Sequence, residues 1–326
     1  MFADFSDVWS PIAIASAVKR NAALRVVVAK TPIVLFRDAA GTLSALLDRC
    51  PHRGVALSLG QVRDGCVVCP FHGWELDGSG AVRHVPWNPD DKRASLRGVS
   101  FPVAERAGLV WLFTGTGSAP AMPEAAAQLL RPELRLTWLE LPFQTHWTRL
   151  MENMLDWPHL PFVHANTIGR GMLGGRQSRL DIDWRPTETG FHSTIAVDGT
   201  AKPGSLEFRW PNQMVLDVPA PGKTFVLFNF CVPEDDGSSR LLAVMARSFL
   251  KLAALDPIFN WSNARIARED KRILESSFPA EVPHPSSELS VRTDAPVLYF
   301  RKRYLEELKK LTPRRLPRAP AAVEPG

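Results

Sequence analysis

Two short segments each pair a cysteine with a histidine: Cys50-Pro51-His52 and Cys69-Pro70-Phe71-His72. Thiolates and neutral imidazoles bind iron and zinc, and two of each can hold a [2Fe–2S] cluster in which histidines replace cysteines on one iron. Gly54 and Gly73 closely follow the two pairs, and glycine permits the tight turns needed to bring both segments to one cluster. The pattern predicts an electron-carrying centre with the ligands Cys50, His52, Cys69 and His72.

A structural zinc site is the alternative, because Cys66 forms a Cys-x-x-Cys pair with Cys69. The opening Cys-x-His spacing fits zinc sites poorly, however. A disulfide is disfavoured because Cys231 lies far away in the sequence, and because the N-terminus lacks the pattern of a secretory leader. We therefore expect a cytoplasmic chain and interpret Cys66 as a buried strand residue.

A second candidate metal site lies in the segment from residue 152 to residue 164. His159 and His164 offer two imidazoles, and two histidines with one carboxylate on one face of iron(II) leave positions open for oxygen. Residues five apart point about 140° apart on a regular helix, but Pro158 and Pro161 interrupt the helix and can redirect the rings. For an isolated pair, two hydrogen-bonded histidines near a helix end would be the simpler interpretation.

Asp270 is the first candidate for the carboxylate ligand. It lies in a run of five charged residues, 268–272, and most such runs are solvated. Its helical phase differs, because Ile266, Ile273 and Leu274 flank it at i−4, i+3 and i+4 and place it on the apolar face. A buried carboxylate needs a compensating charge, which a metal ion supplies. The further candidates are Glu269 and then Glu275.

The motifs CPHRG and CPFHGW resemble the cluster-binding half of the Rieske non-haem iron oxygenases. Respiratory Rieske proteins carry an extra cysteine in each loop, where this chain has Val55 and Phe71, so the resemblance is to the lower-potential oxygenase or ferredoxin type. The pattern Asn-x-x-Asp-x-x-His-x-x-x-x-His, from Asn153 to His164, resembles the iron-binding stretch of the same family. The Glu-Asp-Lys stretch at Asp270 is similar to that of its monooxygenases and demethylases.

The resemblance implies roles for five residues of the second site: His159, His164 and Asp270 as ligands of a mononuclear iron(II), Asn153 as a polar residue near it, and Asp156 as a bridge for electrons. As a bridge, Asp156 would accept hydrogen bonds from His159 and from His72 of a neighbouring subunit. Such a head-to-tail contact closes into a ring, here a homotrimer.

The activity implied by the resemblance is that of a terminal oxygenase. It would use O2 to hydroxylate or oxidatively demethylate an apolar or aromatic small molecule, with a ring dioxygenase less favoured. Candidates to line a substrate pocket, although residues of these types more often form plain core, are Met154, Leu160, Phe162, Phe228 and Phe230. The alternative from another class is a Rieske-type electron carrier with a non-catalytic ligand-binding domain.

The chain shows neither a GxGxxG after a strand nor the cysteine spacing of a plant-type ferredoxin. We therefore expect electrons from a separate reductase or ferredoxin, with NAD(P)H used only indirectly. From Arg301 onward, eight Lys or Arg face three Glu, an excess of five that equals the net charge of the 326-residue chain. The charge thus belongs to a basic tail, and no nucleic-acid partner is expected.

The sequence predicts an α+β protein of two domains and a tail. An all-β Rieske domain is expected at 1–115, a catalytic domain at 116–300, and a basic helix with a disordered tail at 301–326. Strands are expected at 25–28, 33–36, 42–46, 108–113, 193–197, 206–210, 213–218, 225–232 and 241–249, and helices at 146–155 and 257–276. Segment 115–123 reads as a linker and 169–175 as a mobile loop. The resemblance implies a curved antiparallel sheet packed on a long helix (helix-grip, START-like), and no apolar stretch is long enough to span a membrane.

Overall fold

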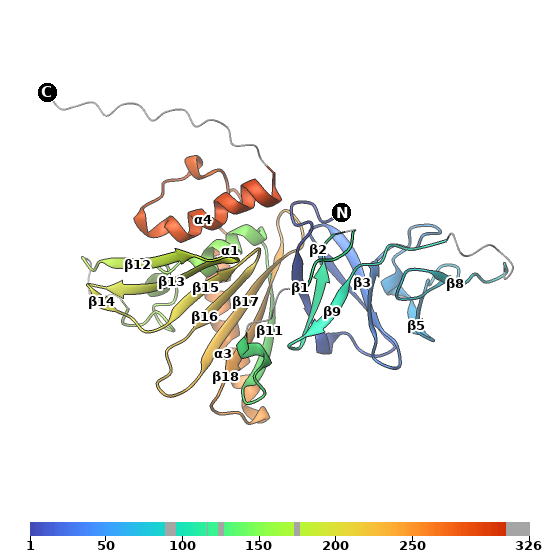
Figure 1. The fold of residues 1–326 in the computed structure, drawn as a ribbon, viewed down its shortest axis with the longest axis horizontal. Helices are drawn as coiled ribbons and strands as arrows, with labels where there is room; N and C mark the ends of the chain where they lie inside the picture. Colours follow the sequence, from blue (N-terminus) through green and yellow to red (C-terminus); the bar gives the residue numbers. More distant parts are fainter. Residues whose placement is uncertain (89–95, 116, 123–126, 173–176, 311–326) are drawn as a thin grey trace.

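Three small antiparallel sheets make up the N-terminal half of the chain (Figure 1). The computed structural model describes residues 1–88, 96–115, 117–122, 127–172 and 177–310. The first sheet has the order β1 (Trp9–Ile14), β10 (Leu109–Phe113), β9 (Val103–Arg106), and the second β2 (Ala23–Val28), β3 (Thr31–Arg37), β4 (Leu43–Leu47). The third contains β5 (Gln61–Arg63), β6 (Cys66–Val68), β7 (Glu75–Leu76) and β8 (Val82–His84). The predicted strands of this half are confirmed, with ends shifted by a few residues.

One eight-stranded antiparallel sheet dominates the C-terminal half. Its order is β11 (Arg135–Phe143), β18 (Ser239–Arg247), β17 (Phe225–Pro233), β16 (Gln213–Asp217), β15 (Ser205–Arg209), β13 (Gly190–Val197), β12 (Leu180–Pro186), with β14 (Thr200–Ala201) beside β13. The predicted α+β class is confirmed. The strand expected at 241–249 ends at Arg247, because Leu250 turns into the left-handed region with a φ of 46°.

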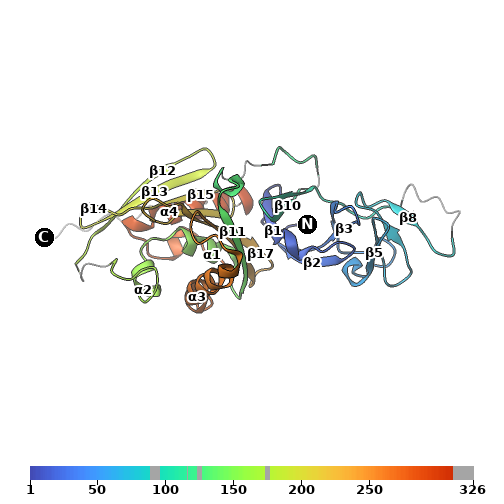
Figure 2. The ribbon, with the colours of Figure 1, turned by 90° about the horizontal axis from the view of Figure 1, so that it is seen from below.

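Helices cover the large sheet (Figures 1 and 2). Helix α1 (Trp147–Leu155) packs on β16, β17 and β18 and lies under α4 (Ala295–Arg303), whereas α3 (Asp256–Leu274) runs beside β11. The helix α3 presents a narrow stripe to the protein, and its buried members are Ala264, Ala267, Asp270 and Leu274. The small residues Ala264 and Ala267 allow α3 to approach β11 closely. Asp270 is the one charged residue in this buried stripe.

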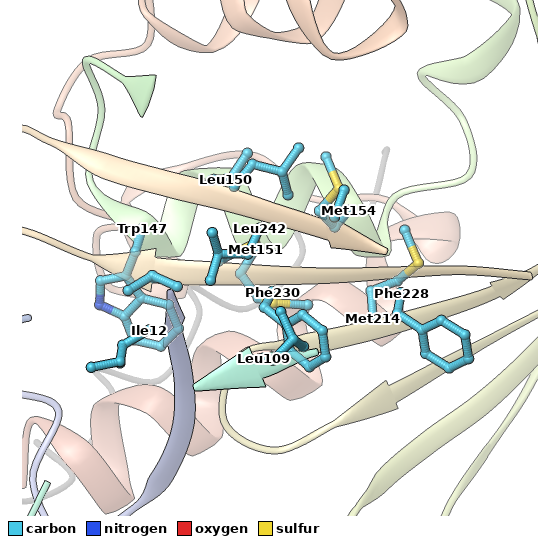
Figure 3. Close-up of a cluster of buried hydrophobic side chains, with 14 of the residues drawn as sticks. Ile12, Leu109, Trp147, Leu150, Met151, Met154, Met214, Phe228, Phe230 and Leu242 are labelled. Carbon is cyan, nitrogen blue, oxygen red and sulfur yellow. The ribbon is translucent and has the colours of Figure 1, made fainter. Parts of the chain in front are cut away.

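The two halves share one hydrophobic core (Figure 3). Ile12 of β1 and Leu109 of β10 belong to the same cluster of buried side chains as Phe228 and Phe230 of β17. Trp111 meets Phe230 edge to face, with ring centroids 5.7 Å apart. The sheet β1–β10–β9 is therefore fixed on the large sheet by apolar burial, the main favourable term in folding.

The second and third small sheets share a separate core. Val67 and Leu76 of the third sheet belong to the same cluster as Phe36 of β3, and this cluster contains both Cys50 and Cys69. The two Cys–His loops therefore lie on a core formed by these two sheets. The third sheet is at the end of the molecule far from α2 (Leu160–Val163) and α3 (Figure 2).

The C-terminal helix begins earlier than the basic segment that the sequence predicts from residue 301. Helix α4 starts at Ala295 and continues as a short π-helical segment, Tyr304–Leu308. Phe300, Tyr304 and Leu308 are buried, so an apolar face of this helical segment docks on the body of the protein. The expected linker and glycine-rich loop fall partly outside the described residues, and the expected disordered tail falls almost wholly outside them.

A buried ion pair ties α4 to α1. Arg301 donates from Nε and Nη2 to the two carboxylate oxygens of Glu152, at 2.7 and 2.9 Å, and also pairs with Glu288 at 2.9 Å. Burial raises the pKa of Glu152, although the hydrogen bonds and charge of Arg301 oppose that shift. The charged form of Glu152 thus depends on Arg301.

Arg301→Met should therefore lower the free energy of unfolding by about 3–5 kcal/mol, because it leaves the Glu152 carboxylate buried with the longer, 3.5 Å ion pair to Arg149 in place of two hydrogen bonds. Urea denaturation followed by tryptophan fluorescence measures this loss. Arg179→Met is the matched control, because Arg179 pairs with Asp181 on the surface and should cost less than about 1 kcal/mol. Equal, small losses in both variants would contradict the structural importance of the buried pair.

Candidate metal centres

The two Cys–His loops share one backbone hydrogen-bond pattern. The amide of Cys50 donates to the carbonyl of Val55 at 2.8 Å, and the amide of Gly54 donates back to the carbonyl of Cys50 at 2.9 Å. Cys69 and Gly73 make the equivalent bonds at 2.8 and 3.0 Å. Both glycines have left-handed φ angles, 73° and 72°, which glycine adopts without steric cost. The sequence thus builds the same turn twice, one for each pair of ligands.

The four predicted cluster ligands meet between these turns. Cys50 and Cys69 are buried. Burial is the main cause that raises the pKa of the Cys50 thiol to about 11, and the neighbouring thiol of Cys69 adds to this effect. The rings of His52 and His72 lie at the surface with centroids 4.7 Å apart, and His52 stacks on Trp74 at 4.6 Å. Two buried thiols thus face two solvent-accessible imidazoles.

The donor types bear on the zinc alternative. Two thiols and two imidazoles are the ligand set of a [2Fe–2S] cluster in which histidines replace cysteines on one iron. Cys66, the cysteine that would complete a Cys-x-x-Cys pair for zinc, lies apart in β6. Within the described residues, the group whose ligand atoms converge on a single metal position is outside these loops. The residues present therefore fit a [2Fe–2S] cluster.

The group that does converge consists of His159, His164 and Asp270. Nε2 of His159 lies 3.6 Å and Nε2 of His164 lies 3.0 Å from the same atom, Oδ1 of Asp270. Although it lies that close to both rings, Oδ1 of Asp270 is buried and has no hydrogen bond of acceptable geometry. An unpaired buried carboxylate oxygen facing two imidazoles is costly unless a cation lies among them. The three side chains fit a two-histidine, one-carboxylate iron site.

Short helix α2 sets the directions of the two imidazoles. His159 directly precedes it and His164 directly follows it, and Pro161 occupies its first turn. The amide of His159 donates to Oδ2 of Asp156 at 2.9 Å, which fixes the start of this segment. A single irregular turn between the two histidines thus achieves the convergence that a regular helix would prevent.

Each imidazole also contacts a second carboxylate through its outer nitrogen. Nδ1 of His159 lies 3.2 Å from Oδ2 of Asp156, and Nδ1 of His164 lies 2.9 Å from Oε2 of Glu269. Burial lowers the pKa of His164, but the negative charges of Asp270 and Glu269 outweigh burial and leave that pKa raised. Such outer carboxylates orient the ligand rings and increase their basicity.

Two further candidates from the sequence, Asn153 and Glu275, do not belong to the converging group. Asn153 lies one turn before Asp156, and its buried Nδ2 has no hydrogen-bond partner among the described residues. Glu275, the third carboxylate candidate, instead accepts a hydrogen bond from the amide of Gln144 and pairs with Lys271. Glu275 is therefore outside the converging group.

Three of the candidates for a substrate pocket, Met154, Phe228 and Phe230, lie in the hydrophobic core. Phe228 and Phe230 are fully buried, because successive strand residues alternate between the faces of β17. The residue between them, Asn229, donates to Sδ of Met154 on α1 at 3.3 Å. Phe162 is 70% exposed at the surface. Sequence reasoning missed Asn229, although a polar residue inside an otherwise apolar strand was a usable signal.

The fold and the two sites define a class of protein: a small β domain with two Cys–His loops is joined to a helix-covered sheet beside which two histidines and one carboxylate converge. Two family models match: the Rieske [2Fe-2S] domain over residues 8–99, and the Vanillate O-demethylase oxygenase C-terminal domain over residues 143–310. The chain belongs to the Rieske oxygenases, as predicted.

Individual relatives agree with this family. The chain is 34% identical to the 4beta-methylsterol monooxygenase of Methylococcus capsulatus, over 80% of this chain and 72% of the relative. It is 29% identical to the chlorophyllide a oxygenase of Chlamydomonas reinhardtii, over 87% of this chain and 46% of the relative. The chain spans about half the length of the chlorophyllide a oxygenases that it matches, 46% to 51%.

A solved structure shares the fold. The structure of Pseudomonas putida CBB5 NdmA superposes with a TM-score of 0.76 at 24% identity, over 92% of this chain and 89% of that chain. Among the helices that the structure describes, none is both long and apolar enough to cross a membrane.

Proposed function

We propose that the chain is a terminal oxygenase that hydroxylates or oxidatively demethylates an apolar or aromatic small molecule. One observation carries the proposal: Oδ1 of Asp270 is buried without a hydrogen bond, facing the two imidazoles of His159 and His164. This group has the ligand arrangement of a mononuclear metal site, and the same chain carries a cluster-binding domain. Together they support a reaction at the mononuclear site that consumes electrons from the cluster.

Different residues would serve the cluster and the mononuclear site. When bound, the cluster would supply single electrons and the mononuclear iron would supply oxygen activation. Cys50 and Cys69 would hold the cluster from the buried side, and the exposed imidazoles of His52 and His72 would face its electron partners. Asn153 would offer its free amide group to the site.

We propose that electrons pass between copies of the chain. Within one chain, the cluster loops and α2 lie at remote ends of the molecule (Figures 1 and 2). Beside the cluster loops, Phe71 is 58% and Trp87 is 97% exposed, a surface suited to contact another protein. In this arrangement, His72 of one copy donates to Asp156 of the next in a homotrimer. Light scattering tests the oligomer, whose mass should be three times that of the chain.

The proposed partners and location follow from the same reasoning. A separate reductase or ferredoxin would reduce the cluster, with NAD(P)H as the indirect source of electrons. All four cysteines are free, as is usual for a cytoplasmic chain. The names of the relatives refer to chlorophyllide a, a 4β-methylsterol and a methylxanthine, all of which are ring compounds. We therefore favour a ring-containing substrate.

Oxygen uptake tests the proposed activity. Purified protein with both metal sites loaded is mixed with a surrogate reductase, NADH and a panel of methylated ring compounds, and oxygen consumption is recorded with product mass. We expect uptake that depends on one class of compound and stops when the mononuclear iron is removed by chelation. If the cluster is reduced and reoxidised while no compound in the panel is oxidised, the chain is an electron carrier instead.

A further inference from the structure

Two consecutive carboxylates of α3 contact the two nitrogens of one imidazole. Asp270 faces Nε2 of His164 at 3.0 Å, and Glu269 faces Nδ1 at 2.9 Å. Neighbouring residues on a helix point about 100° apart, so the two side chains can reach opposite edges of the ring. Glu269 is therefore on the far side of His164 from the converging group and cannot replace Asp270 in it.

Glu269 is itself held in place from other directions. The hydroxyl of Thr167 donates to Oε2 of Glu269 at 2.7 Å, and Arg265, one turn earlier on α3, lies 3.8 Å from Oε1. Thr167 is also bonded to the backbone of the histidine that Glu269 contacts, because the amide of Thr167 donates to the carbonyl of His164 at 2.9 Å. Glu269 thus has a fixed geometry with respect to the ring of His164.

The neutral imidazole of His164 has a single N–H to donate. If Nδ1 carries that hydrogen and donates it to Glu269, Nε2 keeps its lone pair and faces the acceptor oxygen Oδ1 of the Asp270 carboxylate. Two electron-pair donors then face each other at 3.0 Å, in agreement with the missing hydrogen bond at Asp270. This is the arrangement that a metal ion between them requires.

We propose that Glu269 is a positioning residue, which fixes the tautomer and the orientation of His164 so that its Nε2 faces the metal. The proposal rests on the mononuclear site of the proposed function. It also separates the two outer carboxylates. Among the described residues, the side chain of Asp156 contacts His159, whereas Glu269 is also held within its own chain by Thr167 and Arg265.

Metal binding tests the proposal without reference to turnover. The cluster-loaded protein is freed of mononuclear metal by chelation and titrated with Co(II), whose visible bands report both affinity and ligand geometry. Glu269→Ala should weaken Co(II) binding by about 10–100-fold and change the band pattern, as expected for the loss of an outer partner of a ligand histidine. Glu269→Gln keeps an acceptor oxygen and should recover most of the affinity. Thr167→Val should show a smaller loss than Glu269→Ala.

Glu275→Gln is the matched control, because it removes one negative charge from the end of the same helix without contact to either histidine. It should bind Co(II) like the wild type. Unchanged affinity and bands in Glu269→Ala would overturn the positioning role, and if that variant does not fold, a wild-type result for Thr167→Val together with Glu269→Gln would do so. If the wild type and Asp270→Ala bind Co(II) equally, the mononuclear site itself is wrong.

Discussion

Asp270→Ala should lose the mononuclear metal and keep the cluster. Asp270 contributes the one oxygen atom of the converging group, and its Oδ1 is the atom that both Nε2 atoms approach. Two histidines alone bind iron(II) weakly, because a third ligand and its negative charge are missing. We expect metal affinity at this site to fall by more than about 100-fold, beyond the loss typical of an outer partner. Coupled substrate oxidation should fall to background.

Iron analysis and the visible spectrum measure the two halves of this result separately. The cluster absorption should be unchanged, because Cys50 and Cys69 lie in a hydrophobic core distinct from that of α3. Asp183→Ala is a suitable control, since Asp183 is an exposed acid on β12 whose ion pair within the described part of the chain is with Arg185. Full iron occupancy in Asp270→Ala would mean that the carboxylate ligand lies elsewhere.

Asp156→Asn should retain both metals, yet the rate of substrate oxidation should fall by at least about 10–100-fold. The carboxylate of Asp156 accepts from the amide of His159 at 2.9 Å and lies 3.2 Å from Nδ1 of the same residue. Asparagine has the same shape and keeps one acceptor oxygen, so the local turn survives. It lacks the negative charge and the second acceptor oxygen with which Asp156 would bridge two imidazoles.

Stopped-flow absorption distinguishes this effect from a loss of metal. The cluster is first reduced chemically, and oxygen is then added with a substrate. In the wild type, the cluster should be reoxidised as electrons pass to the second site, whereas in Asp156→Asn it should stay reduced far longer. Glu269→Gln provides the comparison, because it alters an outer carboxylate that is held within one chain. Reoxidation of Asp156→Asn at the wild-type rate would refute the bridge.

Local pattern was enough to predict most strands and the long helix. Runs such as 225–232 and 213–218 are apolar or alternating, and both are strands whose ends moved by at most a few residues. The helical phase of Asp270 relative to Ile266, Ile273 and Leu274 predicted a buried position, and Asp270 does lie in the buried stripe of α3 with Leu274, although Ile273 is 45% exposed. These predictions worked because burial on one face leaves a periodic trace in the sequence.

Contacts between distant segments could not be predicted in the same way. The hydrogen bond from Thr167 to Glu269 joins residues that are 102 positions apart, and it depends on how α2 packs against α3. Glu269 was considered as a ligand because its type and position fit, and only the geometry shows that it contacts the outer edge of His164. Phe228 failed as a pocket residue because strand alternation assigns faces but does not say which face is open.

The iron-to-sulfide ratio of the purified protein tests the central claim most directly. We propose that the chain carries a [2Fe–2S] cluster and one further iron bound by His159, His164 and Asp270. After reconstitution with iron(II) under reducing conditions, we predict about three irons and about two acid-labile sulfides per chain. A protein that retains about two irons and two sulfides, with iron(II) in excess, would contradict the two-site account.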